Sequence, residues 1–333
     1  MEQLRKTLGN MTPQSGMRMV VCGHTRPDGD CVGSVLGMTR ALRCQGFDAT
    51  ALLADNNGGK GAPEPYRWMS GWSEYVHPCE LEQQAPPNLF VALDTPELVR
   101  LSDARALCEA ADLRILIDHH PASEGECFAE LIYRDTEAAA TGQIVWNLLG
   151  QLGWPRDAEI ASCCYAALLS DTGGFQFANT TREAFAAAGE MLAAGAEPST
   201  IACHLYGEKP LAALQLEARV LSRACLLNDG LVIHSYLSDA DLQELGVGPD
   251  WTENLIDLIR PVAGSEVAVL ITHGAKGPRV SLRSRGDTDV SAVAVAFGGG
   301  GHRLAAGISW PDKCATREEI LEQLLPLLPG ASE

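Results

Sequence analysis

Apolar and polar positions alternate in blocks along the first third of the chain. Short runs rich in Val, Ile and Leu recur at Met19–Cys22, Thr50–Leu53, Leu89–Leu93 and Arg114–Ile117. Longer Ala- and Leu-rich segments, compatible with helices, lie between these runs. A short apolar run bounded by helix-compatible segments is typical of a βαβ unit. The pattern therefore predicts a mostly parallel, doubly wound sheet in the N-terminal part of the chain.

The pattern changes after Thr136. Four segments of helical length with few β-branched residues follow, at Ala138–Leu149, Arg156–Leu169, Thr181–Ala194 and Ala212–Leu227. Asn228-Asp229-Gly230 is a turn signal, and new strand candidates come after it, at Leu231–Leu237, Glu266–Thr272 and Arg279–Ser284. We predict an α/β protein with an N-terminal domain over residues 1–190, a helical connector over 191–228 and a smaller C-terminal α/β domain over 229–333.

Composition and charge exclude several classes of protein. The chain has 333 residues with 25 Lys plus Arg and 43 Asp plus Glu, a net charge of −18, which disfavours binding of long duplex nucleic acid. The sequence shows neither a signal peptide nor an apolar run of about 18 residues, so we expect a cytoplasmic protein that does not span a membrane. The 11 cysteines are scattered without a CxxC pair, which indicates reduced thiols rather than disulfides or a thiolate zinc site.

Candidate chemistry follows the ends of the predicted strands. His24, Asp28 and Asp30 come after the first run, Asp94 directly follows Leu89–Leu93, and Asp118-His119-His120 follows the fourth run. In doubly wound sheets the carboxyl ends of the strands carry the ligand site. Imidazole and carboxylate groups together suit manganese or another divalent ion of intermediate hardness.

A further aspartate, Asp171, follows an apolar segment and precedes Gly173-Gly174. An aspartate in such a place commonly caps a helix or a turn, and the loop around Asp28-Gly29 alone would suit a polar turn equally well. Acidic or imidazole side chains follow four separate predicted elements, and this makes a simple cap or polar turn at each of them improbable. The sequence therefore predicts a metal site.

These motifs, in this order, resemble the DHH phosphoesterase family. The matching positions are His24–Asp30, Asp94, Asp118–His120 and Asp171, and Gly298–His302 resembles the signature of the DHH-associated second domain. Three further stretches are similar to the nano-RNase/pAp-phosphatase, oligoribonuclease A-like branch of the family: Asp135–Gly142, Thr172–Phe175 and Ser281–Arg285.

The resemblance implies two divalent metal ions, with manganese as the expected metal. Asp94 would bridge the ions, and a hydroxide shared between them would attack the phosphorus, so that no Ser or Cys nucleophile is needed. The implied ligands of the first ion are His24, Asp28 and Asp94, and those of the second are Asp30, Asp94, His119 and Asp171.

The remaining implied residues act on the substrate. Asp118 would orient an imidazole, and His120 would donate to the substrate phosphate and act as a general acid. In the C-terminal domain the expected phosphate-binding residues are Arg283, Arg285, Gly299, Gly300, Gly301 and His302. The simpler alternatives for these are an arginine-bearing exposed strand face and a flexible glycine turn.

We expect a hydrolase of short oligoribonucleotides, of 3′-phosphoadenosine 5′-phosphate (pAp), or of both. A small phosphorylated substrate suits the net charge of −18, because metal ions and a few cationic side chains suffice to hold it. A homodimer is compatible with the sequence. The alternatives are a cyclic or linear dinucleotide phosphodiesterase, a RecJ-like single-strand DNA exonuclease, an inorganic pyrophosphatase and a non-catalytic nucleotide-binding protein.

Overall fold

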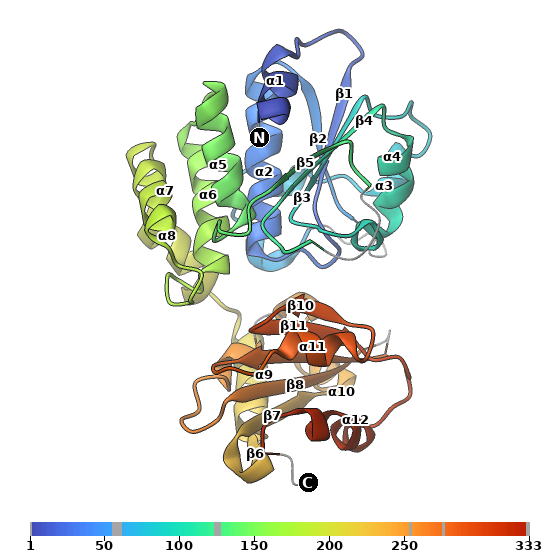
Figure 1. The fold of residues 1–333 in the computed structure, drawn as a ribbon, viewed down its shortest axis with the longest axis vertical. Helices are drawn as coiled ribbons and strands as arrows, with labels where there is room; N and C mark the ends of the chain where they lie inside the picture. Colours follow the sequence, from blue (N-terminus) through green and yellow to red (C-terminus); the bar gives the residue numbers. More distant parts are fainter. Residues whose placement is uncertain (1, 55–61, 123–127, 253–254, 275–276, 331–333) are drawn as a thin grey trace. The chain divides into compact units, whose positions relative to one another are not determined.

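The chain divides into two compact units, Met1–Glu208 and Lys209–Glu333 (Figure 1). The computed structural model describes residues 2–54, 62–122, 128–252, 255–274 and 277–330. The junction between the units falls inside the range 191–228 that we predicted to be a connector.

Five parallel strands form the sheet of the first unit, in the order β2-β1-β3-β4-β5. Each of the four strands predicted from the apolar runs is present, with ends that shift by no more than two residues. No apolar run predicted the fifth strand, which is only four residues long. The strands are β1 (Arg18–Cys22), β2 (Asp48–Leu52), β3 (Leu89–Leu93), β4 (Leu113–Asp118) and β5 (Leu131–Arg134).

Helices cover both faces of this sheet, as Figure 1 shows. Val21 and Val91 pack with the helices α1, α2, α5, α6 and α7 on one face, whereas their neighbours Val20 and Phe90 pack with α3 and α4 on the other. The prediction of a doubly wound α/β domain is therefore confirmed. The helices are α1 (Glu2–Asn10), α2 (Gly29–Cys44), α3 (Pro78–Leu81), α4 (Arg105–Ala110), α5 (Thr141–Leu152), α6 (Ala158–Asp171), α7 (Arg182–Ala193) and α8 (Pro198–Ala202).

The strand order reverses between β1 and β3. After β1 the chain crosses to β2 on one side, and it then returns to place β3 on the other side of β1. At such a switch point the two crossover connections leave in opposite directions and open a crevice outside the carboxyl ends of the strands. The loop after β1 and the residue after β3 lie at this crevice.

The second unit is built around a six-stranded sheet with the order β10-β11-β9-β8-β7-β6. Only the pair β7 and β8 is parallel. Helices α11 and α12 pack on one face and α9 on the other, which gives this smaller unit a core on each side. Its elements are α9 (Leu211–Ser222), β6 (Cys225–Leu227), β7 (Val232–Leu237), α10 (Asp239–Leu245), β8 (Val267–Gly274), β9 (Gly277–Ser284), α11 (Val290–Val295), β10 (Gly300–His302), β11 (Ala305–Ser309) and α12 (Arg317–Leu324).

The predicted helix over Ala212–Leu227 is wrong in its last part. Helix α9 ends at Ser222, and Cys225–Leu227 is the edge strand β6, paired antiparallel with β7. Between the two strands Asn228 and Asp229 take positive φ values of 48° and 53°, a conformation that Asn and Asp adopt more readily than most residues. The turn thus folds the end of the apolar segment back onto the following strand.

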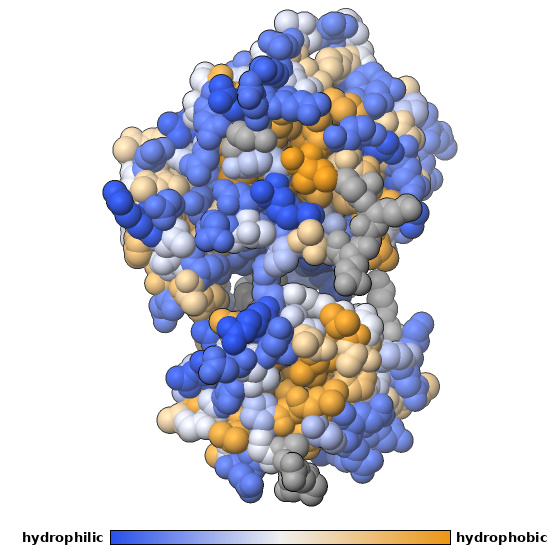
Figure 2. All heavy atoms as spheres, in the orientation of Figure 1, coloured by the Kyte–Doolittle hydropathy of each residue, from blue (hydrophilic) through white to orange (hydrophobic). Residues whose placement is uncertain are grey.

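Hydrophilic side chains dominate the face of the molecule drawn in Figure 2, with smaller apolar areas in each unit. Nowhere in the described ranges does a helix combine the length and the apolar character that crossing a bilayer requires.

Candidate metal centre

Imidazole and carboxylate side chains gather at the carboxyl ends of β1, β3 and β4. His24 lies in the loop after β1, Asp94 directly follows β3, and His119 directly follows β4. These three strands are neighbours in the sheet, so their ends meet at one edge. His24, Asp94 and His119 are buried there, with 4%, 1% and 7% of their surfaces exposed. Six side chains predicted as metal ligands come together in this place.

The first subsite joins the loop after β1 to the end of β3. The Nε2 atom of His24 lies 3.4 Å from Oδ2 of Asp94 and 3.8 Å from Oδ2 of Asp28. His24 is held by its other ring nitrogen, since Nδ1 lies 2.8 Å from the carbonyl oxygen of Thr25. The ring therefore turns Nε2 toward both carboxylates.

The second subsite lies on the other side of Asp94. The Nε2 atom of His119 is 3.5 Å from Oδ1 of Asp94, 3.7 Å from Oδ2 of Asp30 and 3.8 Å from Oδ2 of Asp171. Asp94 thus presents Oδ2 to the first subsite and Oδ1 to the second. This is the arrangement expected of a carboxylate that bridges two ions.

The spacing of these atoms fits ligands of divalent cations. Two ligand atoms about 2.1 Å from one ion and about 90–120° apart are separated by about 3.0–3.6 Å. The separations here run from 3.4 to 3.8 Å, close to that range and mostly longer than a good hydrogen bond. A donor set of imidazole nitrogen and carboxylate oxygen suits an ion of intermediate hardness. The residues present therefore fit a pair of divalent ions.

Asp94 adopts an unusual backbone conformation. Its φ is 56°, in the left-handed region that few residues other than glycine enter. The surrounding structure holds it there, because its N–H donates to the carbonyl of Ile117 at 3.1 Å and its Oδ1 accepts from Oγ1 of Thr141 at 3.1 Å. Strained residues of this kind cluster at functional sites. The turn at Asp94 aims its carboxylate between the two subsites.

Three donors hold the carboxylate of Asp30. The backbone N–H groups of Thr141 and Gly142, at the start of α5, donate to its two oxygens at 2.7 and 2.9 Å, and Oγ of Ser34 donates to Oδ1 at 2.9 Å. The start of a helix attracts negative charge, because its first N–H groups point outward. Helix α5 therefore fixes Asp30, and Ser34 helps to position this carboxylate.

Asp28 and Asp171 are each fixed by their helices. Asp28 caps α2 and accepts from the N–H of Cys31 at 2.9 Å. Asp171 is the last residue of α6, and Nδ2 of Asn179 donates to its carbonyl at 3.1 Å and lies 3.4 Å from its Oδ2. Nδ2 of Asn179 also donates to the carbonyl of Ala139, so it joins Asp171 to the segment before α5.

The crowded carboxylates shift the acid–base equilibria of the imidazoles. Burial lowers the pKa of His24, but its contacts with Asp28 and Asp94 outweigh burial and raise the pKa to about 9. Burial likewise opposes protonation of His119, yet the charges of Asp171, Asp30 and Asp94 raise its pKa to about 9. Positive charge therefore stabilises the cluster of carboxylates. Protons on the imidazoles supply it in the metal-free chain, and divalent cations would supply it in their place.

The carboxylates respond in opposite directions. Burial raises the pKa of Asp171 to about 6, and burial together with the charge of Asp94 raises that of Asp30. Asp94 differs because burial is outweighed by His24, His120 and His119, which hold its pKa well below the usual range. Asp94 therefore stays ionised in the metal-free cluster, whereas Asp30 and Asp171 take up protons more readily.

Asp118 and His120 form a separate pair beside the cluster. Asp118 has no exposed surface, and its Oδ1 accepts from Nδ1 of His120 at 2.8 Å and from the N–H of His120 at 3.2 Å. That Asp118 orients an imidazole stays a prediction, and His120 is the imidazole that it contacts. Nδ1 of His120 also lies 3.4 Å from Oδ1 of Asp94, which places the ring against the cluster.

Apart from His120, the residues predicted to bind phosphate belong to the second unit. Arg283 lies on β9, and its Nε is 4.0 Å from Oδ1 of Asp257. Arg285 lies just beyond β9, where its Nη1 donates to the carbonyls of Arg260 and Val262 at 3.4 and 3.2 Å. Arg285 therefore anchors a neighbouring segment in addition to any role in binding.

The glycine cluster forms β10 and the turn before it. A Cβ on Gly299 would lie 2.3 Å from the carbonyl oxygen of Gly307, and one on Gly301, whose φ is 145°, would lie 2.4 Å from that of Ala305. These two glycines are thus required for the close approach of β10 to β11. A Cβ on Gly300 would meet nothing within 4 Å, and His302 ends the strand opposite Ala305.

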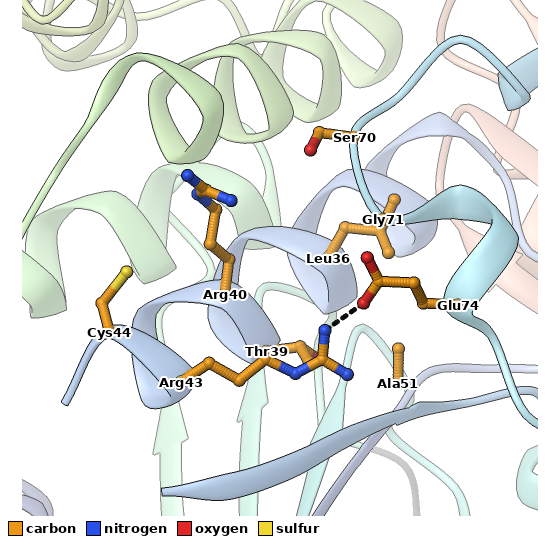
Figure 3. A pocket seen from close by; sticks show the side chains of 9 residues that line it. All are labelled: Leu36, Thr39, Arg40, Arg43, Cys44, Ala51, Ser70, Gly71 and Glu74. Carbon is orange, nitrogen blue, oxygen red and sulfur yellow. Dashed lines mark hydrogen bonds and ion pairs between the residues drawn. The ribbon is translucent and has the colours of Figure 1, made fainter. Parts of the chain in front are cut away.

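A pocket of about 240 Å³ opens along the second half of α2 (Figure 3). Its cationic side chains are already paired: Arg43 forms an ion pair with Glu74, and Arg40 contacts carboxylates at the start of α6. Leu36, the pocket residue nearest the start of α2, lies eight residues after Asp28, roughly 12 Å along the helix. The pocket is distinct from the metal cluster, and its paired arginines do not form an anion site.

The sequence did not predict three side chains that contact the site residues. Thr141 donates to Asp94, Asn179 contacts Asp171, and Arg134 lies 3.6 Å from Asp118. Thr141 lies in the stretch Asp135–Gly142 that resembles the family, and this was a usable signal. Asn179 and Arg134 act across the fold, and no local pattern marks them.

The buried carboxylates and imidazoles at the switch point of the sheet define a candidate centre for divalent metal ions. The family model described as the N-terminal domain of the DHH family matches residues 18–168, and that of the DHHA1 domain matches residues 229–328. The chain belongs to the DHH phosphoesterase family and is therefore a hydrolase.

Individual relatives are similar over most of the chain. The bifunctional oligoribonuclease and PAP phosphatase NrnA of Thermus thermophilus is 34% identical over 86% of this chain and 82% of its own length. The protein of the same name from Bacillus subtilis is 27% identical over 86% of this chain and 87% of its own. An exopolyphosphatase-related protein of Bacteroides fragilis has a similar fold, with a TM-score of 0.82, 22% identity and coverage of 93% of this chain and 92% of that one.

Proposed function

We propose that this protein is a two-metal phosphoesterase of short nucleotides that hydrolyses oligoribonucleotides of a few residues, pAp, or both. The observation that carries the proposal is the placement of Asp94, whose two oxygens face His24 on one side and His119 on the other. The similarity to two relatives named as bifunctional oligoribonucleases and PAP phosphatases supports the choice of substrate. Manganese is the metal we expect, because the donor set is mixed imidazole and carboxylate.

The ligands of each ion follow from the two subsites. His24 and Asp28 would hold the first ion, Asp30, His119 and Asp171 the second, and Asp94 both. When bound, two divalent ions lower the pKa of a water molecule toward neutrality and neutralise the phosphoryl oxygens during in-line attack.

The chain itself supplies orientation and a proton. Asp118 accepts from Nδ1 of His120, and this fixes Nε2 as the ring nitrogen that acts on the substrate. We assign to Nε2 a hydrogen bond to the substrate phosphate and the transfer of a proton to the leaving oxygen. In the second unit Arg283, Gly300 and His302 are proposed to bind a substrate phosphate through guanidinium, backbone N–H and imidazole donors.

A substrate panel with Mn²⁺ tests the proposal. We expect mononucleotides to be released from RNA of two to five residues, phosphate to be released from pAp, or both. Chelation of the metal, or the substitution Asp94→Asn, should abolish either reaction. The panel also contains a cyclic dinucleotide, pyrophosphate and long single-stranded DNA.

The panel has outcomes that overturn the proposal. Fastest turnover of the cyclic dinucleotide, of pyrophosphate or of long DNA would assign the protein to another reaction of the family. Tight nucleotide binding without turnover would indicate a non-catalytic binding protein. A cytoplasmic location and a homodimer stay predictions of the sequence.

A further inference from the structure

Arg134 faces the buried carboxylate of Asp118 from the neighbouring strand. The two residues are direct partners in the parallel pairing of β4 and β5, so their side chains project from the same face of the sheet. Nε of Arg134 lies 3.6 Å from Oδ2 of Asp118. The side chain of Arg134 is 21% exposed and that of Asp118 is fully buried. The strand register thus brings a cation to the inner side of a buried anion.

The two oxygens of Asp118 have different neighbours. Oδ1 accepts two hydrogen bonds from His120, one from Nδ1 at 2.8 Å and one from the backbone N–H at 3.2 Å. Oδ2 and Nε of Arg134 are both buried, and within the described part of the chain neither atom makes a hydrogen bond. The ion pair with Arg134 is therefore the compensation that the structure gives Oδ2.

A buried carboxylate with one uncompensated oxygen is unstable in its orientation. The side-chain torsion that rotates a carboxylate is broad, so packing and charge, rather than an intrinsic rotamer, must hold it. Without the guanidinium, Oδ2 would be left in a water-poor site without a partner, and this costs free energy that rotation or hydration would relieve. Rotation of Asp118 would move the acceptor away from Nδ1 of His120.

We propose that Arg134 is a positioning residue for His120 and acts through Asp118. By holding Oδ2, the guanidinium keeps Oδ1 aimed at Nδ1, which fixes both the orientation of the imidazole and the ring nitrogen that carries the Asp118-bonded proton. The inference rests on the proposed function, in which Nε2 of His120 acts on the substrate. Loss of a partner in direct contact with a functional group, as Asp118 is with His120, typically changes activity by about 10–100-fold. Arg134 acts one contact further out, so we expect its removal to fall at the lower end of that range.

Arg114 offers a matched control. It lies on β4 four residues before Asp118, and its guanidinium forms an ion pair with Glu130, away from His120. Arg114→Met removes the same cation from the same sheet as Arg134→Met, but it leaves Asp118 untouched. A general loss of charge or of strand stability would affect both variants.

The experiment measures kcat, KM and Mn²⁺ affinity for wild type, Arg134→Met, Arg134→Lys and Arg114→Met with a short oligoribonucleotide or pAp. We expect Arg134→Met to lower kcat about 10-fold, with KM and Mn²⁺ affinity within about twofold of wild type. Arg134→Lys should recover much of the loss, because its ammonium keeps the positive charge beside Oδ2. Arg114→Met should have the kcat, KM and Mn²⁺ affinity of wild type.

A spectroscopic measurement separates this inference from the proposed function. In ¹⁵N-histidine spectra of the metal-free protein, the Nδ1–H signal of His120 should shift or broaden in Arg134→Met and remain unchanged in Arg114→Met. The inference is overturned if kcat and this signal are unchanged in Arg134→Met, or if Arg134→Lys loses as much as Arg134→Met. If wild type is inactive but the His120 signal still changes in Arg134→Met, the proposed function alone is overturned.

Discussion

Gly142 couples the packing of α5 against α6 to the position of Asp30. A Cβ added to Gly142 would lie 2.4 Å from Cβ of Ala167 and 3.2 Å from the carbonyl oxygen of Cys164. Neither atom belongs to the end of a flexible side chain, so no rotamer change relieves the clash. Carbon atoms in good contact lie about 3.5–4.0 Å apart, and the substitution Gly142→Ala therefore requires a separation of about 1–1.5 Å between the helices.

The same movement disturbs the metal site. Helix α5 holds Asp30 through the N–H groups of Thr141 and Gly142, at 2.7 and 2.9 Å. A displacement of about 1 Å breaks one or both hydrogen bonds, and a misplacement of this size costs about 100-fold in rate. Overpacking costs about 1–3 kcal/mol, against which alanine regains at most about 1 kcal/mol of helix propensity. We expect a net loss of about 1–2 kcal/mol in the free energy of unfolding.

The assay combines urea unfolding of the metal-free protein with turnover of a short substrate. Gly189→Ala is the control, since Gly189 lies within α7 and its added Cβ meets nothing within 4 Å. That variant should gain about 0.5–1 kcal/mol and keep wild-type activity. The reasoning is refuted if Gly142→Ala is as stable and as active as wild type, because the close approach of α5 would then have no consequence for Asp30.

Three further predictions concern ligands and buried charge. Asp28→Asn should remove binding of one Mn²⁺ ion, whereas Asp94→Asn should weaken both, as measured by calorimetric titration; equal effects of the two variants would contradict the shared role of Asp94. Asp241→Asn should lower the free energy of unfolding by about 3 kcal/mol at pH 7. The carboxylate of Asp241 is 3% exposed and forms ion pairs with Arg219 and Arg223. We take the lower end of the range for a broken buried ion pair because the two arginines are about a quarter exposed. The Arg223 hydrogen bond holds the pKa of Asp241 well below its usual range, so the stabilisation is present above the unfolded-state pKa and is lost as pH falls; a difference between variant and wild type that does not shrink in acid would contradict this. Burial lowers the pKa of His234 to about 4, so wild type should lose up to about 3 kcal/mol as pH falls from 6.5 to 4, and His234→Gln should lack this part of the loss in urea unfolding at both pH values.

The ligand cluster could be predicted because it depends on two regularities of the fold. Apolar runs revealed the strands, and parallel strands bring the residues that follow them to one edge of the sheet. His24, Asp94 and His119 meet for this reason. Asp171 comes from a helix end; its place before Gly173-Gly174 suggested that it belongs to the same site, and the resemblance to a family motif assigned it to the second ion.

Residues that act across the fold could not be predicted. Arg134 reaches Asp118 because β4 and β5 pair in one particular register, and the sequence reading did not detect β5. Arg285 follows the end of β9, which was predicted at the correct residue, but its contacts with the carbonyls of Arg260 and Val262 were not. In both cases the contact joins segments that are distant in the sequence, and apolar patterning does not locate the partner.

The number of Mn²⁺ ions that the metal-free protein binds tests the central claim most directly. Titration followed by electron paramagnetic resonance of free Mn²⁺ counts the bound ions per chain. Since Asp94 faces two sets of ligands, we expect wild type to bind two ions per chain. The variant Asp94→Asn should bind neither ion with high affinity. A single bound ion, or a count that Asp94→Asn leaves unchanged, would contradict the claim.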